Sequence, residues 1–220
     1  MLKNKTKIVG PISALIILML ISIIIFFSYN SPLNNSTIII KVACIGDSIT
    51  EFSYYPEYLQ QTLGSSYTVK NFGVSGATVL IDTDRPYMYQ DNCQKAKMFL
   101  PNIVIIMLGT NDAKENIFVS IDNFVSQYIR LINEFRTLES NPQIWIAYPP
   151  PIFPNEMDIS SQNLAEGIIP RINQISIESG LPTINVFDAL SNCSDYFLDG
   201  VHPNKDGAFQ IASLVYDSIK

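Results

Sequence analysis

Three side chains in this chain of 220 residues have the types and spacing needed for acyl transfer by a serine nucleophile. Ser48 lies just after an apolar, β-branched run at residues 37–44, and a strand that ends there places the serine at the carboxyl edge of a parallel sheet. His202 is the only histidine, and Asp199 precedes it by three residues. Serine is a weak nucleophile unless a base takes its proton, which an imidazole can do near neutral pH. On a single tight turn, Asp199 would orient the ring and stabilise its charged form.

Acyl transfer also requires hydrogen-bond donors that face the developing oxyanion. Three candidates lie at strand ends: the backbone N–H groups of Ser48 and Gly73, and the side-chain amide of Asn111. Glycine suits a loop where the backbone must approach a ligand closely. Taken singly, Gly73 is more simply a tight turn and Asn111 a turn-stabilising side chain. The convergence of four strand-end loops on one edge favours the catalytic interpretation.

The elements that must position these residues are apolar strand patterns that alternate with helical patterns. Such alternation predicts βαβ units around a parallel sheet. We therefore expect a three-layer, flavodoxin-like α/β fold whose five-stranded parallel sheet has the order 2-1-3-4-5. The strands are expected at residues 37–44, 67–72, 103–108, 143–147 and 183–187. Helices are expected from near Pro56 onward and at residues 94–100, 121–138, 162–179 and 205–219. Pro170 predicts a break or kink inside the fourth of these helices.

The N-terminal segment differs from the rest of the chain. Residues 1–7 are short and basic, and residues 8–27 form an almost wholly apolar run without charge, long enough to cross a hydrocarbon core of about 30 Å as a helix. This pattern predicts one N-terminal transmembrane helix that acts as an uncleaved signal anchor. A cleaved signal peptide is the alternative, although the run is long for one and no Ala-x-Ala follows. The preceding lysines would hold the N-terminus in the cytoplasm.

A polar linker at residues 28–36 is expected to lead into a catalytic domain at residues 37–220, outside the cell or in a secretory lumen, or secreted if the N-terminal segment is cleaved. Sequons at Asn34, Asn35 and Asn192 would matter only in an organism that glycosylates secreted chains. The net charge is −6 although the N-terminus is basic, so the domain is acidic and no nucleic-acid partner is expected.

The cysteines suggest a possible disulfide and no metal site. Cys44 is expected to be a small buried residue of the first strand. Cys93 and Cys193 are expected in loops at the carboxyl edge of the sheet, where they could pair in an oxidising compartment. No Cys/His spacing suggests zinc.

Four short blocks of this sequence resemble those of the GDSL esterases, also called SGNH hydrolases. They are GDSI at residues 46–49, NFGVSG at 71–76, GTND at 109–112 and DGVHP at 199–203. Isoleucine stands where the family name has leucine, and the similarity of spacing extends over about residues 41–220. The Gly-x-Ser-x-Gly elbow of the α/β-hydrolases is absent, because Thr50 replaces its last glycine.

The resemblance implies a role for each candidate residue. Ser48 would be the nucleophile, His202 its base and Asp199 the partner that orients the histidine. The implied oxyanion hole consists of Ser48, Gly73 and Asn111. The reaction would pass through an acyl-enzyme, and it would need no metal or organic cofactor.

Residues 46–116 resemble the carbohydrate O-acetylesterase-like branch of that family, which implies short acyl esters, acetyl foremost, on a small molecule or glycan. Four aromatic side chains could stack on a sugar or simply pack the loops: Tyr54, Tyr55, Tyr87 and Tyr89. A lysophospholipase or thioesterase is the alternative enzyme, which a membrane tether would suit, and an acyltransferase would use the same residues. A tethered glycan-binding module and a phosphate-binding loop at residues 47–50 are alternatives from other classes, and the intact triad and the acidic domain argue against them.

Overall fold

The computed structural model describes residues 16, 19–23, 26 and 39–220. The chain divides into two compact units, residues 1–37 and 38–220, and the second unit is the α/β domain. Residues 16, 19–23 and 26 are helical, but most of the predicted membrane span at 8–27 and the whole linker at 28–36 fall outside the described residues. Within the described part, no helix is both long and apolar enough to cross a membrane. The anchor therefore stays a prediction.

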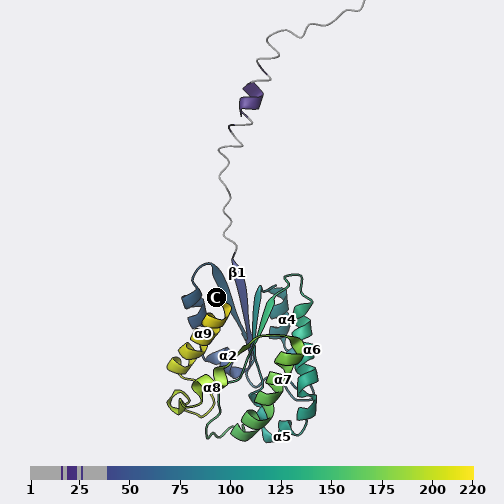
Figure 1. The fold of residues 1–220 in the computed structure, drawn as a ribbon, viewed down its shortest axis with the longest axis vertical. Coiled ribbons are helices and arrows are strands. Elements are labelled where there is room, and N and C mark those ends of the chain that lie inside the picture. Colours follow the sequence, from purple (N-terminus) through teal and green to yellow (C-terminus); the bar gives the residue numbers. More distant parts are fainter. Residues whose placement is uncertain (1–15, 17–18, 24–25, 27–38) are drawn as a thin grey trace, which may run out of the picture. The chain divides into compact units, whose positions relative to one another are not determined.

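A five-stranded parallel sheet forms the centre of the domain, as the alternating pattern predicted (Figure 1). Its order is β2-β1-β3-β4-β5, the predicted flavodoxin-like order. The register places Gly46 of β1 beside both Gly73 of β2 and Met107 of β3, so the loops after these three strands begin next to one another. The strands are β1 (Ile40–Gly46), β2 (Tyr67–Gly73), β3 (Ile103–Met107), β4 (Gln143–Ala147) and β5 (Thr183–Ile184).

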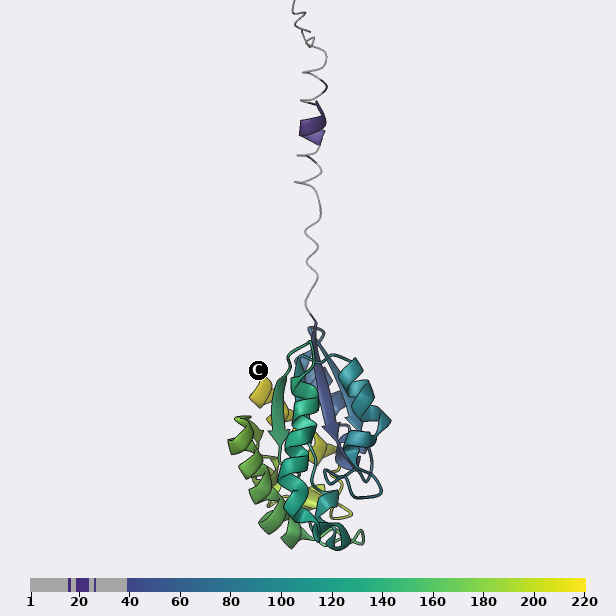
Figure 2. The same cartoon turned by 90° about the vertical axis from the view of Figure 1, so that its right-hand side faces the viewer.

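Helices cover both faces of the sheet and complete the three layers. One face carries α3 (Tyr55–Leu63), α8 (Val186–Leu190) and α9 (Lys205–Ile219). The opposite face carries α4 (Asp91–Met98), α6 (Phe124–Arg136) and α7 (Ile169–Ser179), which Figure 2 shows side by side. Side chains of the central strands alternate between the two resulting cores, and all five residues of β3 are buried. This double burial explains why residues 103–108 form an unbroken apolar run.

Shorter helices connect these elements. The π-helical turn at residues 163–168 runs into α7, whose first turn contains Pro170, where a break or kink was predicted. Proline lacks the N–H that the previous turn would need, so the helical hydrogen-bond pattern changes there. The remaining short helices are α2 (Ser48–Phe52), α5 (Glu115–Phe118) and 3₁₀ turns at Tyr87–Tyr89, Asn111–Ala113, Ile121–Asn123 and Ser194–Tyr196.

Two details of the predicted secondary structure are wrong. The fifth strand is shorter than residues 183–187, because the Asn185 side chain accepts a hydrogen bond from the Asp188 N–H at 3.0 Å and starts α8. The helix expected from near Pro56 is α3, but the short helix α2 before it was not predicted; the Asp47 carboxylate caps α2 by accepting from the Ile49 N–H at 2.9 Å. Both errors arise from short helices whose only sequence signal is a capping side chain.

The suggested Cys93–Cys193 disulfide is also wrong. All three cysteines lie in the described part of the chain and are free. Cys93 is part of α4, not of a loop, and is buried in the core on the α4 face of the sheet. Cys193 packs against the core on the opposite face, so the sheet separates the two sulfur atoms. Cys44 is buried in β1 as expected, and burial raises the pKa of its thiol to about 12.

Candidate active site

The position of Ser48 depends on the tight turn that joins β1 to α2. Gly46 is the last residue of the strand, and a Cβ there would lie 1.9 Å from the Thr50 hydroxyl oxygen and 2.7 Å from the Met107 carbonyl oxygen. Only glycine fits that close approach. The Asp47 cap then fixes Ser48 as the first helical residue, where N-terminal N–H groups have no partner within the helix.

The structure brings Ser48, His202 and Asp199 into one hydrogen-bonded line. The Ser48 Oγ lies 2.9 Å from the His202 Nε2, and the His202 Nδ1 lies 2.7 Å from the Asp199 Oδ2. The other Asp199 oxygen accepts from the backbone N–H groups of Val201, at 2.9 Å, and His202, at 2.7 Å. Asp199 therefore holds the ring from a single tight turn, as its spacing predicted.

Asp199 is ionised at neutral pH. Partial burial opposes its ionisation, but the hydrogen bonds from the backbone and ring of His202 and from the backbone of Val201 prevail and lower its pKa. An ionised carboxylate at Nδ1 favours the tautomer with the proton on that nitrogen. The His202 Nε2 is then free to accept the Ser48 hydroxyl proton. The arrangement can therefore generate a serine nucleophile.

A second loop, which no sequence motif indicated, braces the histidine turn. Gly200 has φ +80°, and a Cβ there would lie 2.2 Å from the Pro154 carbonyl oxygen. The Phe153 N–H donates to the Gly200 carbonyl oxygen at 2.8 Å. This contact explains the glycine of the DGVHP block. The bracing segment is rich in proline and has no periodicity, so no pattern predicted its course.

The structure does not support Gly73 as an oxyanion donor. Its N–H already donates to the Asn71 side-chain oxygen at 2.9 Å, and a Cβ there would lie 2.4 Å from the Glu51 backbone nitrogen. Gly73 therefore allows β2 to pack closely against α2. The predicted assignment is corrected for this residue, because an occupied N–H cannot also be directed at a substrate.

Gly76, three residues later, has the free backbone N–H that an oxyanion donor requires and that Gly73 lacks. It has φ +74°, and its N–H has no hydrogen-bond acceptor within residues 39–220. The Asn111 side-chain amide donates to the carbonyl oxygen of the next residue, Ala77, at 3.1 Å, which holds Gly76 close to Asn111. That bond uses one of the two amide hydrogens, so Asn111 keeps a second donor. The Ser48 N–H likewise has no acceptor in the described domain.

The four tyrosines suggested for sugar stacking separate into two pairs. Tyr55 and Tyr87 are completely buried, and Tyr87 donates to the Phe72 carbonyl oxygen at 2.8 Å, so neither can touch a sugar. Tyr54 and Tyr89 are exposed.

Two buried carboxyl groups adjoin the site residues in sequence. Asp112, next to Asn111, accepts from the backbone N–H groups of Val79 and Leu80 at 3.0 and 2.9 Å. These bonds connect the loop that contains Val79 and Leu80 to the Asn111 turn. Burial nevertheless raises the pKa of Asp112 to about 7, and that of Asp47 to about 6. No sequence pattern indicated this role for Asp112, because only the fold places its partners beside it.

These raised pKa values predict that the domain loses stability between about pH 4 and pH 7. The folded state keeps protons that the unfolded chain releases, so the free energy of unfolding falls as pH rises. A fall of more than about 1 kcal/mol is expected, since a tenfold change in proton affinity corresponds to about 1.4 kcal/mol. Urea denaturation at pH 5 and pH 7.5 measures it. The pKa of Asp199 is lowered, so its contribution changes only below this interval. An Asp112→Asn variant should show a weaker dependence, and an increase in stability over the same interval would contradict the assignment.

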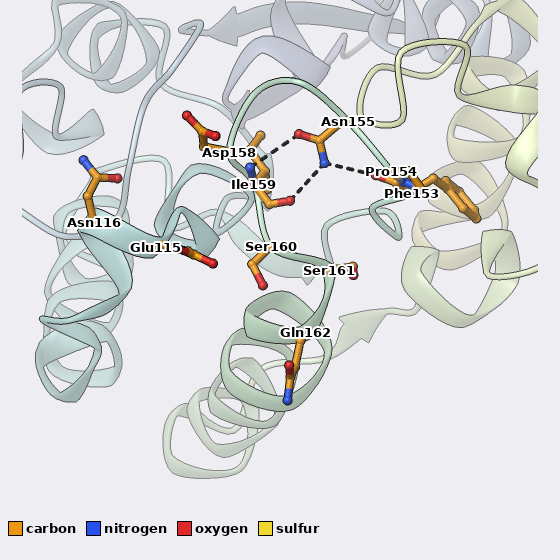
Figure 3. Close-up of a pocket in the computed structure, with 10 residues that line it drawn as sticks. All are labelled: Glu115, Asn116, Phe153, Pro154, Asn155, Asp158, Ile159, Ser160, Ser161 and Gln162. Carbon is orange, nitrogen blue, oxygen red and sulfur yellow. Dashed lines mark hydrogen bonds between the residues drawn. The ribbon is translucent and has the colours of Figure 1, made fainter.

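A pocket of about 770 Å³ lies between α5 and residues 153–162. Figure 3 shows its lining side chains, with the Asn155 amide bonded inside its own loop. The lining residues are Glu115, Asn116, Phe153, Pro154, Asn155, Asp158, Ile159, Ser160, Ser161 and Gln162.

Comparison with known proteins agrees with this geometry. The model of the GDSL-like Lipase/Acylhydrolase family matches residues 44–208. An acetylxylan esterase of Xylanibacter ruminicola is 33% identical over 207 residues, a match that covers 82% of this chain and 43% of that protein. The chain thus spans less than half the length of this curated relative.

Solved structures support the fold. An aryl esterase of M. smegmatis has a TM-score of 0.68 at 20% identity, covering 82% of this chain and 98% of that one. A carbohydrate acetylesterase family member from Sinorhizobium meliloti has a TM-score of 0.66 at 21% identity, covering 82% and 97%. The chain belongs to the GDSL-like lipase/acylhydrolase family of serine ester hydrolases, the family that its four sequence blocks predicted.

Proposed function

We propose that this protein is a serine esterase that removes short acyl groups, acetyl foremost, from carbohydrates. The observation that carries the proposal is the hydrogen-bonded line from Ser48 through His202 to Asp199. The acetyl and carbohydrate assignments draw support from the acetylxylan esterase relative and from carbohydrate acetylesterases among the similar folds.

The proposed mechanism has two halves that use the same histidine. The His202 Nε2 takes the proton of the Ser48 hydroxyl as its oxygen attacks the ester carbonyl, and Asp199 stabilises the resulting imidazolium. When the tetrahedral intermediate collapses, the imidazolium protonates the leaving alcohol and an acyl-serine remains. His202 then deprotonates a water molecule that attacks the acyl carbon. Collapse of the second intermediate releases the carboxylic acid and returns the proton to Ser48.

The proposed oxyanion hole consists of the Ser48 N–H, the Gly76 N–H and the free hydrogen of the Asn111 amide. Each is a donor without an acceptor in the described domain, and each follows the carboxyl end of a strand of the sheet. Gly76 takes the place that the sequence suggested for Gly73. Donors fixed in advance need no reorganisation when charge develops on the carbonyl oxygen.

Replacing Asn111 with alanine is expected to lower kcat on p-nitrophenyl acetate by about 10²- to 10³-fold, the effect of removing one oxyanion donor. KM should change little, because the donor acts on charge that develops only in the transition state. Steady-state kinetics measures both constants. Asn111 also bonds to Ala77, so a thermal unfolding curve must show that the variant is folded. Full activity in a folded variant would contradict the assignment of Asn111 to the oxyanion hole.

A series of p-nitrophenyl acetate, butyrate and octanoate tests the proposed substrate class. We expect kcat/KM to be highest on acetate, by about tenfold or more over octanoate, because a site shaped for an acetyl group must accommodate six further methylene groups in octanoate. A preference for octanoate would instead favour the lysophospholipase or thioesterase alternative. Acetyl groups recovered on an added sugar rather than as acetate would indicate an acyltransferase.

The place of action is part of the proposal. The apolar run at residues 8–27 supports a membrane-anchored protein with its catalytic domain outside the cytoplasm, where polymeric glycans would be accessible. Protease accessibility of residues 39–220 in intact cells tests this topology.

A further inference from the structure

The pocket between α5 and residues 153–162, which we call the α5 pocket, is much larger than an acetyl group requires. Its volume of about 770 Å³ lies within the range of ligand-binding pockets, about 300–1,000 Å³. None of the triad residues lines it. The α5 pocket therefore has room for a part of the substrate that does not react.

Hydrogen bonds connect the walls of the α5 pocket to both halves of the catalytic machinery. The Phe153 N–H donates to the carbonyl oxygen of Gly200, which lies between Asp199 and His202. At the other end, the Ser160 N–H donates at 3.3 Å to the carbonyl oxygen of Ala113, which ends the short helical turn begun by Asn111. The pocket thus lies between the histidine loop and the Asn111 turn.

The pocket wall is held in shape without a ligand. The Asn155 side-chain amide donates to the Phe153 and Ile159 carbonyl oxygens at 3.0 and 2.9 Å (Figure 3). Its oxygen accepts from the Met157 N–H at 2.9 Å. An isolated β-bridge between Lys114 and Ile159 joins this loop to the segment that begins α5. A preformed wall binds without the cost of ordering a loop.

The lining chemistry suits hydroxyl groups and opposes anions. Five of the ten described lining side chains carry an amide or a hydroxyl group, and such groups can both donate to and accept from sugar hydroxyls. Two exposed carboxylates, Glu115 and Asp158, also line the pocket, whereas none of its ten described lining residues is basic. The nearby cations Lys114 and Arg85 line a neighbouring pocket instead, which shares Asn116 with the α5 pocket and contains two carboxylates of its own, Asp82 and Asp84. An anionic ligand in the α5 pocket would therefore meet negative charge without a compensating cation.

We propose that the α5 pocket binds neutral sugar units adjacent to the acylated one, and that Glu115 and Asp158 select against uronic acid units there. This inference rests on the proposed esterase function, because the selected sugar must belong to the substrate whose ester Ser48 cleaves.

The test compares three substrates with the full-length protein. They are p-nitrophenyl acetate, an acetylated neutral xylo-oligosaccharide, and the same oligosaccharide carrying a uronic acid unit. The wild type should show a higher kcat/KM on the neutral oligosaccharide than on the anionic one. A Glu115→Gln, Asp158→Asn double variant should raise kcat/KM on the anionic substrate by about three- to tenfold at low salt, as expected for two solvent-screened charges. Its kcat/KM on p-nitrophenyl acetate should not change.

Two further variants make the result specific to the α5 pocket. Glu139→Gln removes an exposed carboxylate that does not line it, and should leave the neutral-to-anionic ratio at the wild-type value. Ser161→Trp fills the pocket from a position that lines no other described pocket, and should lower kcat/KM on both oligosaccharides but not on p-nitrophenyl acetate. An unchanged ratio in the double variant, with p-nitrophenyl acetate still cleaved, would overturn the charge selection alone. Absence of Ser48-dependent cleavage of p-nitrophenyl acetate by the wild type would instead overturn the proposed function.

Discussion

Replacing Ser48 with alanine is expected to lower kcat on p-nitrophenyl acetate by about 10⁴- to 10⁶-fold, the range for loss of a nucleophile that acts with its base as one unit. No other side chain of the described domain is placed to form the acyl-enzyme, because His202 Nε2 has its hydrogen bond to Ser48 alone. The remaining activity should come from the oxyanion-hole donors and from substrate binding, without covalent catalysis. A steady-state assay with acetate titration measures the loss directly.

The same substitution should leave the domain folded. Within residues 39–220, the only side-chain hydrogen bond of Ser48 is the one to His202, and the Asp47 cap that starts α2 does not involve the Ser48 side chain. Ser75→Ala is a matched control from a neighbouring loop, because the backbone N–H of Ser75, not its hydroxyl, donates to Glu51. The control should keep wild-type activity. If Ser48→Ala kept more than about a tenth of the wild-type rate, the loss would be far smaller than nucleophile removal causes and a serine mechanism would be excluded.

The catalytic line was predictable because each of its members is specified locally. Asp199 reaches His202 across three residues of one turn, and Ser48 follows directly from a strand end. The long-range step, which joins Ser48 to His202 across 154 residues, followed from the rule that parallel strands of an open sheet present their carboxyl ends at one edge. Local turns and one general rule of topology were therefore sufficient.

The oxyanion donors were less predictable, because a glycine in a block does not reveal where its N–H points. Gly73 and Gly76 lie in the same segment, yet the N–H of Gly73 is taken by the Asn71 side chain two residues earlier. Such a bond depends on the rotamer of Asn71, whose amide nitrogen is also held by the Thr50 carbonyl oxygen at 2.8 Å. The packing of α2 against β2 therefore decides which glycine remains free.

The α5 pocket could not be predicted from the sequence either, because it too depends on particular hydrogen bonds. Its wall at residues 153–162 contains no periodic pattern, and the contacts that shape it come from Asn155 within the loop and from Gly200 far along the chain. Loops of this kind are ordered by particular hydrogen bonds rather than by hydrophobic patterning. Under our proposal substrate selectivity depends on this loop, which is why the sequence predicted the reaction more closely than the sugar.

Replacing Asp199 with asparagine should lower kcat by about 10⁴-fold, although the new side chain has nearly the same shape. Its amide oxygen can still accept from the Val201 and His202 N–H groups, so the turn should persist. Its amide nitrogen, however, would donate to the His202 Nδ1, which forces the ring proton onto Nε2. That nitrogen could then no longer accept the Ser48 proton. The loss should appear in kcat while KM stays close to the wild-type value.

Because His202 and Asp199 are partly exposed, an alternative to control of the tautomer by Asp199 can be tested. The side chains of His202 and Asp199 are 33% and 45% exposed, so water could replace the carboxylate as partner of Nδ1 if Asp199 contributed only a weak, screened charge. In that case the loss would be less than about tenfold, and Asp199→Ala would behave like Asp199→Asn. If Asp199 fixes the tautomer, alanine should be the milder change, because it leaves Nδ1 free to bond to water as a donor.

Asp195→Asn, in the same loop and without a side-chain hydrogen bond in the described domain, should keep full activity. The order of the two Asp199 variants therefore separates control of the tautomer from simple electrostatic support.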